Sequence, residues 1–209
     1  MADLSLNLIK QLYYKEGLST IEIAKRLKVT PWKILKFMKK MNLPRRTFTE
    51  ANIKRFEKKP TTFSLKKKLS PREKELKIAG IMLYWAEGSN PHGKNWTVDL
   101  ANSDPKMVKL FLQFLRTICG IDEKRLRVLL YCYSNQRPDE LKRYWSKITN
   151  VPLAQFIKPY VRNDFLPEKV DRMKYGLVHI RYSDKKLLLQ IRKWIAEYLQ
   201  KCKIQNMHG

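Results

Sequence analysis

The segment Ile78-Ala-Gly-Ile-Met-Leu-Tyr-Trp-Ala-Glu-Gly-Ser89 predicts a helix in the middle of the chain. Residues 77–85 are apolar on most sides, so we expect this helix to be buried. It ends in a carboxylate, Glu87, directly before Gly88. An acid at the end of an apolar helix is either solvated at a frayed end or held by a cation, and the sequence leaves both interpretations open.

Strand and helix patterns follow that segment toward the C-terminus. Asp104 and Pro105 predict the start of a helix that ends before Gly120. Strands are expected over residues 95–101, 125–133, 155–162 and 175–182, and further helices over residues 139–149 and 184–201. These elements indicate an α+β domain, residues 75–209, with a mixed or antiparallel sheet.

Basic and aromatic residues recur at alternate positions of the predicted strands. They form three groups that can each share one strand face: Arg125, Arg127, Tyr131 and Tyr133; Lys158, Tyr160 and Arg162; and His179 with Arg181. A face of this composition is not buried in a hydrocarbon core. It is either solvated or lies in a DNA groove, where a β-ribbon fits and arginine pairs with guanine edges.

Three short helical patterns occupy residues 4–43. Ser19 and Glu22 form a capping-box sequence at the start of the second. Thr30 is expected to cap the third, with Pro31 at its first position. The third helix is expected to bury Ile34, Leu35, Met38 and Met41 and to expose its lysines.

Residues 18–30 resemble the helix-turn-helix of resolvases and sigma factors, with Ala24 as the small residue and a tight turn at Lys28-Val29. The resemblance implies a DNA-binding domain, residues 1–44, whose third helix enters a major groove. The residues that it places nearest to DNA are Thr30, Trp32, Lys33, Lys36 and Lys40. The alternative is a three-helix interaction module with a solvated lysine face.

The charge of the chain favours a polyanionic partner. Its 209 residues include 44 Lys and Arg against 19 Asp and Glu, for a formal net charge of +25. Such a charge repels itself unless a polyanion is near, and nucleic acids are the commonest polyanions. We expect residues 45–74 to be a basic linker that tracks phosphates through Arg45, Arg46, Lys66, Lys67 and Lys68.

Several classes of protein are excluded by simpler features. The three cysteines are odd in number and widely spaced, which argues against a disulfide scaffold or a cysteine-rich zinc site. The longest apolar run, nine residues, is too short to span a bilayer, and the first residues do not form a secretory signal. We therefore expect an intracellular protein of the cytoplasm or nucleoid.

Residues 75–203 resemble the core of the LAGLIDADG homing-endonuclease superfamily. The resemblance rests on Ala86-Glu87-Gly88-Ser89 at the helix end and on residues 98–104, a strand that leads into the next helix. The order of the later strands and the closing helix also matches. In that family the motif helix forms an interface, its terminal acid binds the catalytic Mg²⁺, and a saddle-like antiparallel sheet contacts a long DNA site. One motif in the chain implies a homodimer.

For this sequence, the resemblance implies that Glu87 binds Mg²⁺ and that Arg181 assists catalysis. Asn102 or Asp99 matches a polar residue near the metal. The function implied is site-specific, Mg²⁺-dependent cleavage of double-stranded DNA. Two alternatives on the same fold are a non-catalytic DNA-binding regulator and an RNA-binding splicing cofactor.

The sequence departs from the family pattern within the motif helix. Ala79-Gly80, the small pair, lies farther from the acid than in the family. The bulky Tyr84-Trp85 occupies the turn between them.

Overall fold

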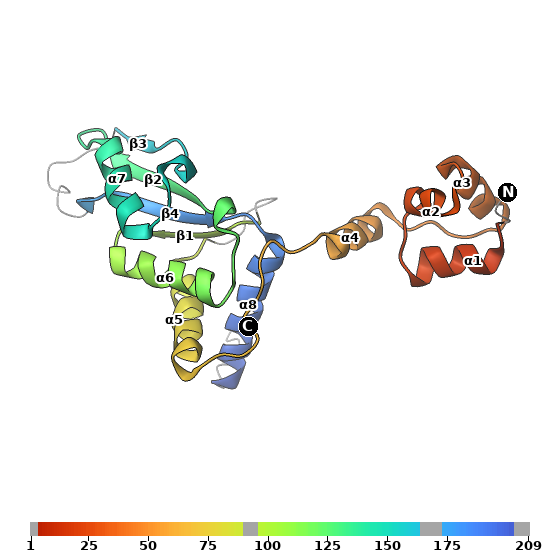
Figure 1. The fold of residues 1–209 in the computed structure, drawn as a ribbon, viewed down its shortest axis with the longest axis horizontal. Coiled ribbons are helices and arrows are strands. Elements are labelled where there is room, and N and C mark those ends of the chain that lie inside the picture. Colours follow the sequence, from red (N-terminus) through yellow and green to blue (C-terminus); the bar gives the residue numbers. More distant parts are fainter. Residues whose placement is uncertain (1–3, 90–95, 164–172, 203–209) are drawn as a thin grey trace, which may run out of the picture. The chain divides into compact units, whose positions relative to one another are not determined.

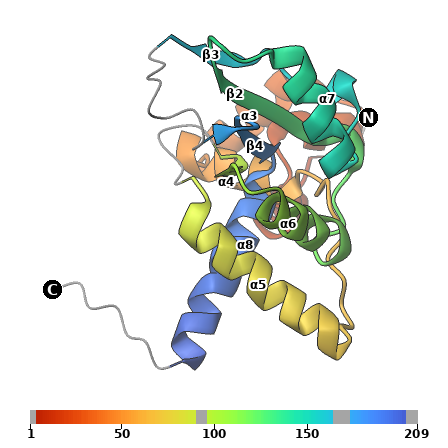
Figure 2. The same ribbon diagram turned by 90° about the vertical axis from the view of Figure 1, so that its left-hand side faces the viewer.

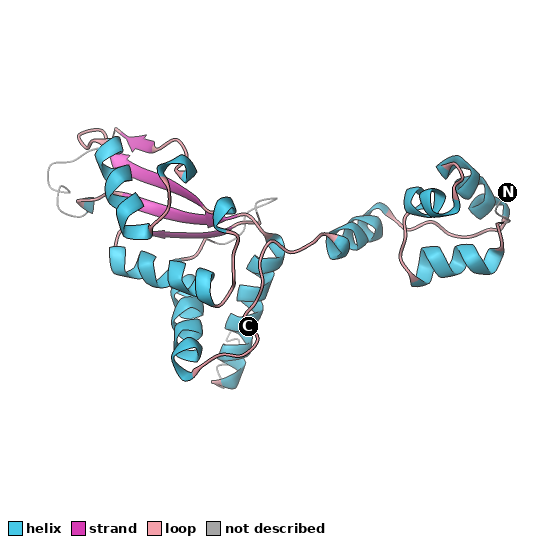
Figure 3. Cartoon of the chain, viewed as in Figure 1, coloured by secondary structure: helices cyan, strands magenta, loops and turns pink. Residues whose placement is uncertain are grey.

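The computed structural model describes residues 4–89, 96–163 and 173–202 (Figure 1). The chain divides into two compact units, Met1–Pro60 and Thr61–Gly209. The described part of unit 1 is helical, whereas unit 2 combines helices with a four-stranded sheet (Figure 3). The α+β class is therefore confirmed. No helix in the described ranges has the length and apolar character needed to cross a membrane.

Unit 1 is built from helices with strong local start sequences. They are α1 (Leu6–Lys10), continued by the π-helical turn η1 (Gln11–Lys15), α2 (Thr20–Leu27), α3 (Pro31–Lys40) and α4 (Phe48–Lys58). The capping box of Ser19 and Glu22 and the cap of Thr30 on the Lys33 amide are both confirmed. A small core formed mainly by Ile9, Leu12, Ile23, Ile34 and Met38 joins α1 to α3. Met41, expected to be buried, is instead exposed at the end of α3.

Helix α4 lies inside residues 45–74, which we expected to be a basic linker. Thr47 and Glu50 form a capping box at its start. Arg46, just before α4, binds to η1 and to the turn that follows η1, because its guanidinium donates to the carbonyls of Tyr13 and Gly17 at 3.1 and 3.0 Å. The later residues of the segment belong to unit 2. The basic segment is therefore divided between the two units rather than forming one linker.

Unit 2 contains a mixed sheet. Its elements are α5 (Pro71–Glu87), β1 (Val98–Asn102), α6 (Pro105–Thr117), η2 (Glu123–Arg125), β2 (Arg127–Tyr133), α7 (Pro138–Thr149), η3 (Leu153–Gln155), β3 (Tyr160–Arg162), β4 (Leu177–Tyr182) and α8 (Lys185–Lys201). The strand order is β1-β4-β2-β3. β4 is antiparallel to both neighbours, but β3 runs parallel to β2. Of the two predicted alternatives, the mixed sheet is therefore confirmed and the antiparallel sheet is wrong.

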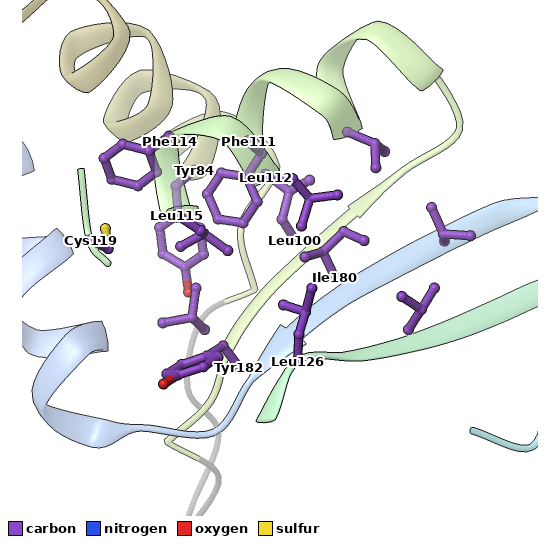
Figure 4. Close-up of a cluster of buried hydrophobic side chains, with 14 of the residues drawn as sticks. Tyr84, Leu100, Phe111, Leu112, Phe114, Leu115, Cys119, Leu126, Ile180 and Tyr182 are labelled. Atoms are coloured by element: carbon purple, nitrogen blue, oxygen red, sulfur yellow. The ribbon is translucent and has the colours of Figure 1, made fainter. Parts of the chain in front are cut away.

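The core of unit 2 lies between the helices and one face of this sheet (Figure 4). Helix α5 packs beside α6 and α8 (Figure 2). Gly80 permits the close approach of α5 to α6, because a Cβ there would lie 2.2 Å from Cγ of Phe114. The rings of Tyr84 and Phe111 stack with their centroids 5.7 Å apart. Burial of these apolar surfaces is the main stabilising contribution of the unit.

Three predicted elements need correction. Helix α5 is not buried on most sides, because the side chains of Ile78 and Trp85 are 39% and 58% exposed. The strand expected over residues 155–162 is reduced to the three residues of β3, preceded by η3 and Pro159, which has no amide to donate. Arg125 lies in η2 rather than in a strand. Residue 95, the expected start of the first strand, lies outside the described residues.

Candidate nucleic-acid interface

The strand register brings most members of the three predicted strand groups onto one face of the sheet. Tyr160 pairs with Tyr131 across β3 and β2, and Arg181 pairs with Arg127 across β4 and β2. We call this the open face, because the helices in the described part of unit 2 pack against the other one. It consists of Asp99, Ala101, Arg127, Leu129, Tyr131, Tyr133, Tyr160, Arg162, Leu177, His179 and Arg181. Of these, Asp99, Leu129 and the predicted DNA contact Tyr133 are buried.

A row of contacts crosses all four strands on the open face. The ring centroids of Tyr160 and Tyr131 are 4.9 Å apart, and those of Tyr131 and His179 are 4.7 Å apart. On the other side of His179, its Nδ1 lies 2.8 Å from Oδ1 of Asp99. Arg181 donates from Nε to the second oxygen of the same carboxylate at 2.8 Å. The row therefore joins the edge strand β3 to the edge strand β1.

Asp99 is the buried charge of the open face, with 5% of its surface exposed. Burial alone would raise the pKa of this carboxyl, but hydrogen bonds with His179 and Arg181 outweigh burial and hold the pKa below its usual range. Asp99 is therefore ionised at neutral pH. Its negative charge is close to His179 and Arg181 on β4.

The arginines around this row differ in their surroundings. Arg127 donates to the carbonyls of Lys124 and Leu126, both at 2.7 Å, which fixes its guanidinium at the start of β2. The guanidinium of Arg162 lies 5.8 Å from the centre of the Tyr133 ring. Arg125, in η2, donates to the carbonyl of Ser183 and is not part of the strand face.

The other predicted basic residues lie outside the open face. Lys158 is exposed and precedes β3, so it does not share a strand with Tyr160 and Arg162. Lys66 forms an ion pair with Glu73 at 2.6 Å. Arg45, Lys67 and Lys68 are exposed, whereas Arg46 is engaged within unit 1.

On α3 the predicted DNA-contacting residues are mostly exposed. Trp32 is 67% exposed, and the amine of Lys36 lies 4.9 Å from the centre of its ring. Lys40 is also exposed, but Lys33 is half-buried. The hydroxyl of Thr30 is used to cap the helix.

The predicted metal-site residues differ in their surroundings. Glu87 is exposed at the end of α5. Asn102 lies on the helix-covered side of β1, where its Oδ1 accepts a hydrogen bond from the Asp104 amide at 2.8 Å. Asp99 is held by its two β4 partners. A Mg²⁺ site needs several oxygen ligands, and the assignment of these residues to one stays a prediction.

The full role of two members of the row was not predicted from the sequence. Tyr160 was placed on a strand face but not among the binding residues, and Asp99 was only an alternative to Asn102. A useful indication was present: Asp99 is an acid between two strongly apolar strand residues, Val98 and Leu100. Such an acid requires a partner, and the strand with the basic pattern His179 and Arg181 offered two.

Comparison with known proteins does not assign a family or a function to this chain. The chain finds no match among family models, curated proteins or solved structures.

Proposed function

We propose that this protein binds double-stranded DNA through α3 of unit 1 and through the open face of unit 2. The observation that carries the proposal is the composition of the open face, where Arg127, Arg162 and Arg181 share a surface with tyrosine and histidine rings. Guanidinium groups suit both phosphates and guanine edges. The net charge of +25 supplies the long-range attraction.

The order of helices in unit 1 supports the same proposal. Helices α2 and α3 follow each other through a short turn, in which Lys28 has the left-handed conformation. Trp32 and Lys36 lie exposed on α3, where such a domain contacts the major groove.

Titration of the full chain with a mixed-sequence duplex at several salt concentrations tests the proposal. We expect log K to fall steeply with log salt, because counterions are released from the duplex. The double variant Lys36→Ala with Lys40→Ala should reduce that slope by about two. The matched control is Lys10→Ala with Lys15→Ala, which removes two exposed lysines from α1 and η1. Equal losses in the two variants, or no duplex binding, would contradict the proposal.

A second candidate function, Mg²⁺-dependent cleavage by a homodimer, is favoured by one feature of α5. Ile78 and Trp85, seven residues apart and hence on one side of this helix, are both exposed. A second copy packed on this side would cover them and bring the ends of the two α5 helices, where Glu87 is the last residue, toward a common axis. Two carboxylates with a DNA phosphate form a ligand set suited to Mg²⁺, which would activate water and neutralise phosphate charge.

The cleavage candidate is tested with duplexes selected for tight binding. Digestion should need Mg²⁺, stop with EDTA and be lost in Glu87→Gln. The matched control is Glu75→Gln, which removes another exposed carboxylate of α5 and should cut normally. Tight binding without cutting would reject this candidate and leave the binding proposal in place.

A further inference from the structure

We propose that the β3 side of the open face is a stacking site for an unpaired nucleobase of single-stranded nucleic acid. The site is formed by Tyr160 and Tyr131, with His179 behind them. This inference goes beyond duplex binding and rests on the proposed function only in taking nucleic acid as the ligand.

The outermost ring of the row is exposed to solvent. Tyr160 lies on the short edge strand β3 and is 56% exposed, although its ring contacts Tyr131. The planes of these two rings are inclined by 42°, so they do not form a closed parallel stack. An aromatic ring supported on one side and open on the other can accept a further planar group.

A hollow adjoins the two tyrosines. It has a volume of about 480 Å³ and is lined by Tyr131, Tyr160, Val161, Arg162 and Asn163. This volume lies within the range of small-molecule sites and accommodates one base. Its lining joins aromatic rings to a guanidinium, which can meet a phosphate, and to a side-chain amide, which can bond a base edge.

The chemistry of the site distinguishes an unpaired base from an intact duplex. In a duplex the flat faces of the bases are covered by their neighbours, and only their edges are accessible in the grooves. An unpaired base offers its face, and base–aromatic stacking tolerates any sequence because every base has a π-face.

The row is organised without a ligand. Asp99 bonds Nδ1 of His179 and so holds the imidazole beside Tyr131. Tyr131 in turn supports Tyr160 from the central strand β2. A site whose rings are already in place loses little conformational entropy when a base binds.

The experiment uses the full chain and a single-stranded oligothymidylate that carries one 2-aminopurine. The fluorescence of this base is quenched when it stacks on an aromatic ring, so quenching reports stacking rather than mere attraction. We expect saturable quenching by the wild-type chain. Tyr160→Ala should abolish the quenching and weaken binding roughly 5- to 150-fold. Tyr160→Phe, which keeps the ring, should quench like the wild type.

A charge control separates stacking from electrostatics. Arg162→Ala should require more protein to reach saturation but should give the full quenching there. The inference is overturned if the wild type does not bind the strand, if it binds without quenching, or if Tyr160→Ala quenches like the wild type.

Duplex binding is measured in parallel with the same proteins. We expect Tyr160→Ala to lose more affinity for the single strand than for the duplex, since the duplex has no free base face. Quenching without duplex binding would reject the proposed function but leave the stacking site. Duplex binding without quenching would do the reverse.

Discussion

The two faces of the sheet in unit 2 are formed by the same strands but carry different side chains. On the covered face of β4, Val178, Ile180 and Tyr182 are all 0% exposed. On the open face of the same strand, His179 and Arg181 interact with a buried carboxylate and with an aromatic ring. Successive residues along the strand point to opposite faces of the sheet.

The two faces of the sheet are stabilised by different kinds of contact. The covered face is held by apolar burial, which has no preferred direction. The open face is held by directed contacts, in which one acid on β1 fixes two side chains on β4. Truncating a side chain should therefore have effects of different size on the two faces. These effects should also differ in their dependence on pH and salt.

The largest effect is expected on the covered face. Ile180→Ala should lower the free energy of unfolding by about 2–5 kcal/mol, because the cavity lies between strands and helices that cannot collapse freely. Urea unfolding followed by circular dichroism measures this loss. The matched open-face truncation, Arg162→Ala, should cost less than about 0.5 kcal/mol. Similar losses in the two variants would remove the distinction between the faces.

An intermediate effect is expected at Asp99. Asp99→Asn should lower the free energy of unfolding by about 1–3 kcal/mol at neutral pH, since it leaves Arg181 without its carboxylate.

The same variant has a pH dependence of known sign. The pKa of Asp99 is lowered in the folded chain, so its stabilising contribution is present above the unfolded value and is lost as the pH falls through the folded one. The difference between wild type and Asp99→Asn should therefore shrink below about pH 4. Unfolding curves at neutral and acid pH make the comparison, and a constant difference would show that the carboxylate charge is not responsible.

The smallest effect on stability is expected for Arg162, the charge at the β3 edge. Its loss should be measurable mainly in DNA binding. Arg162→Ala should reduce the slope of log K against log salt for duplex by about one, the value for one lost phosphate contact. Arg162→Lys keeps the charge and should keep the slope. If both variants bind like the wild type, the β3 edge does not contact phosphates.

Local features were predictable from the sequence. The caps at Ser19, Thr30 and Asp104 were expected and are present, because each depends on residues within one helical turn. The capping box of Thr47 and Glu50 was equally visible, but the basic composition around it favoured a linker.

Features that depend on distant residues were not predictable. Asp99 and His179 are 80 positions apart, so their contact follows only from the strand order. The parallel pairing of β3 depends on the path of the chain through α7. Trp85 is a similar case, since an apolar run does not show which side of a helix its own chain will cover.

The boundary between the units has a consequence for gene rearrangement. The chain divides after Pro60, two residues beyond the end of α4 and two before Thr62, whose hydroxyl bonds the Asp184 carboxylate at the start of α8. A fusion at this point would interrupt no described helix or strand. Each fragment would also carry away part of the basic stretch, including Arg45 on one side and Lys67 on the other. Either fragment, transferred to another coding sequence, would bring its own positive charge with it.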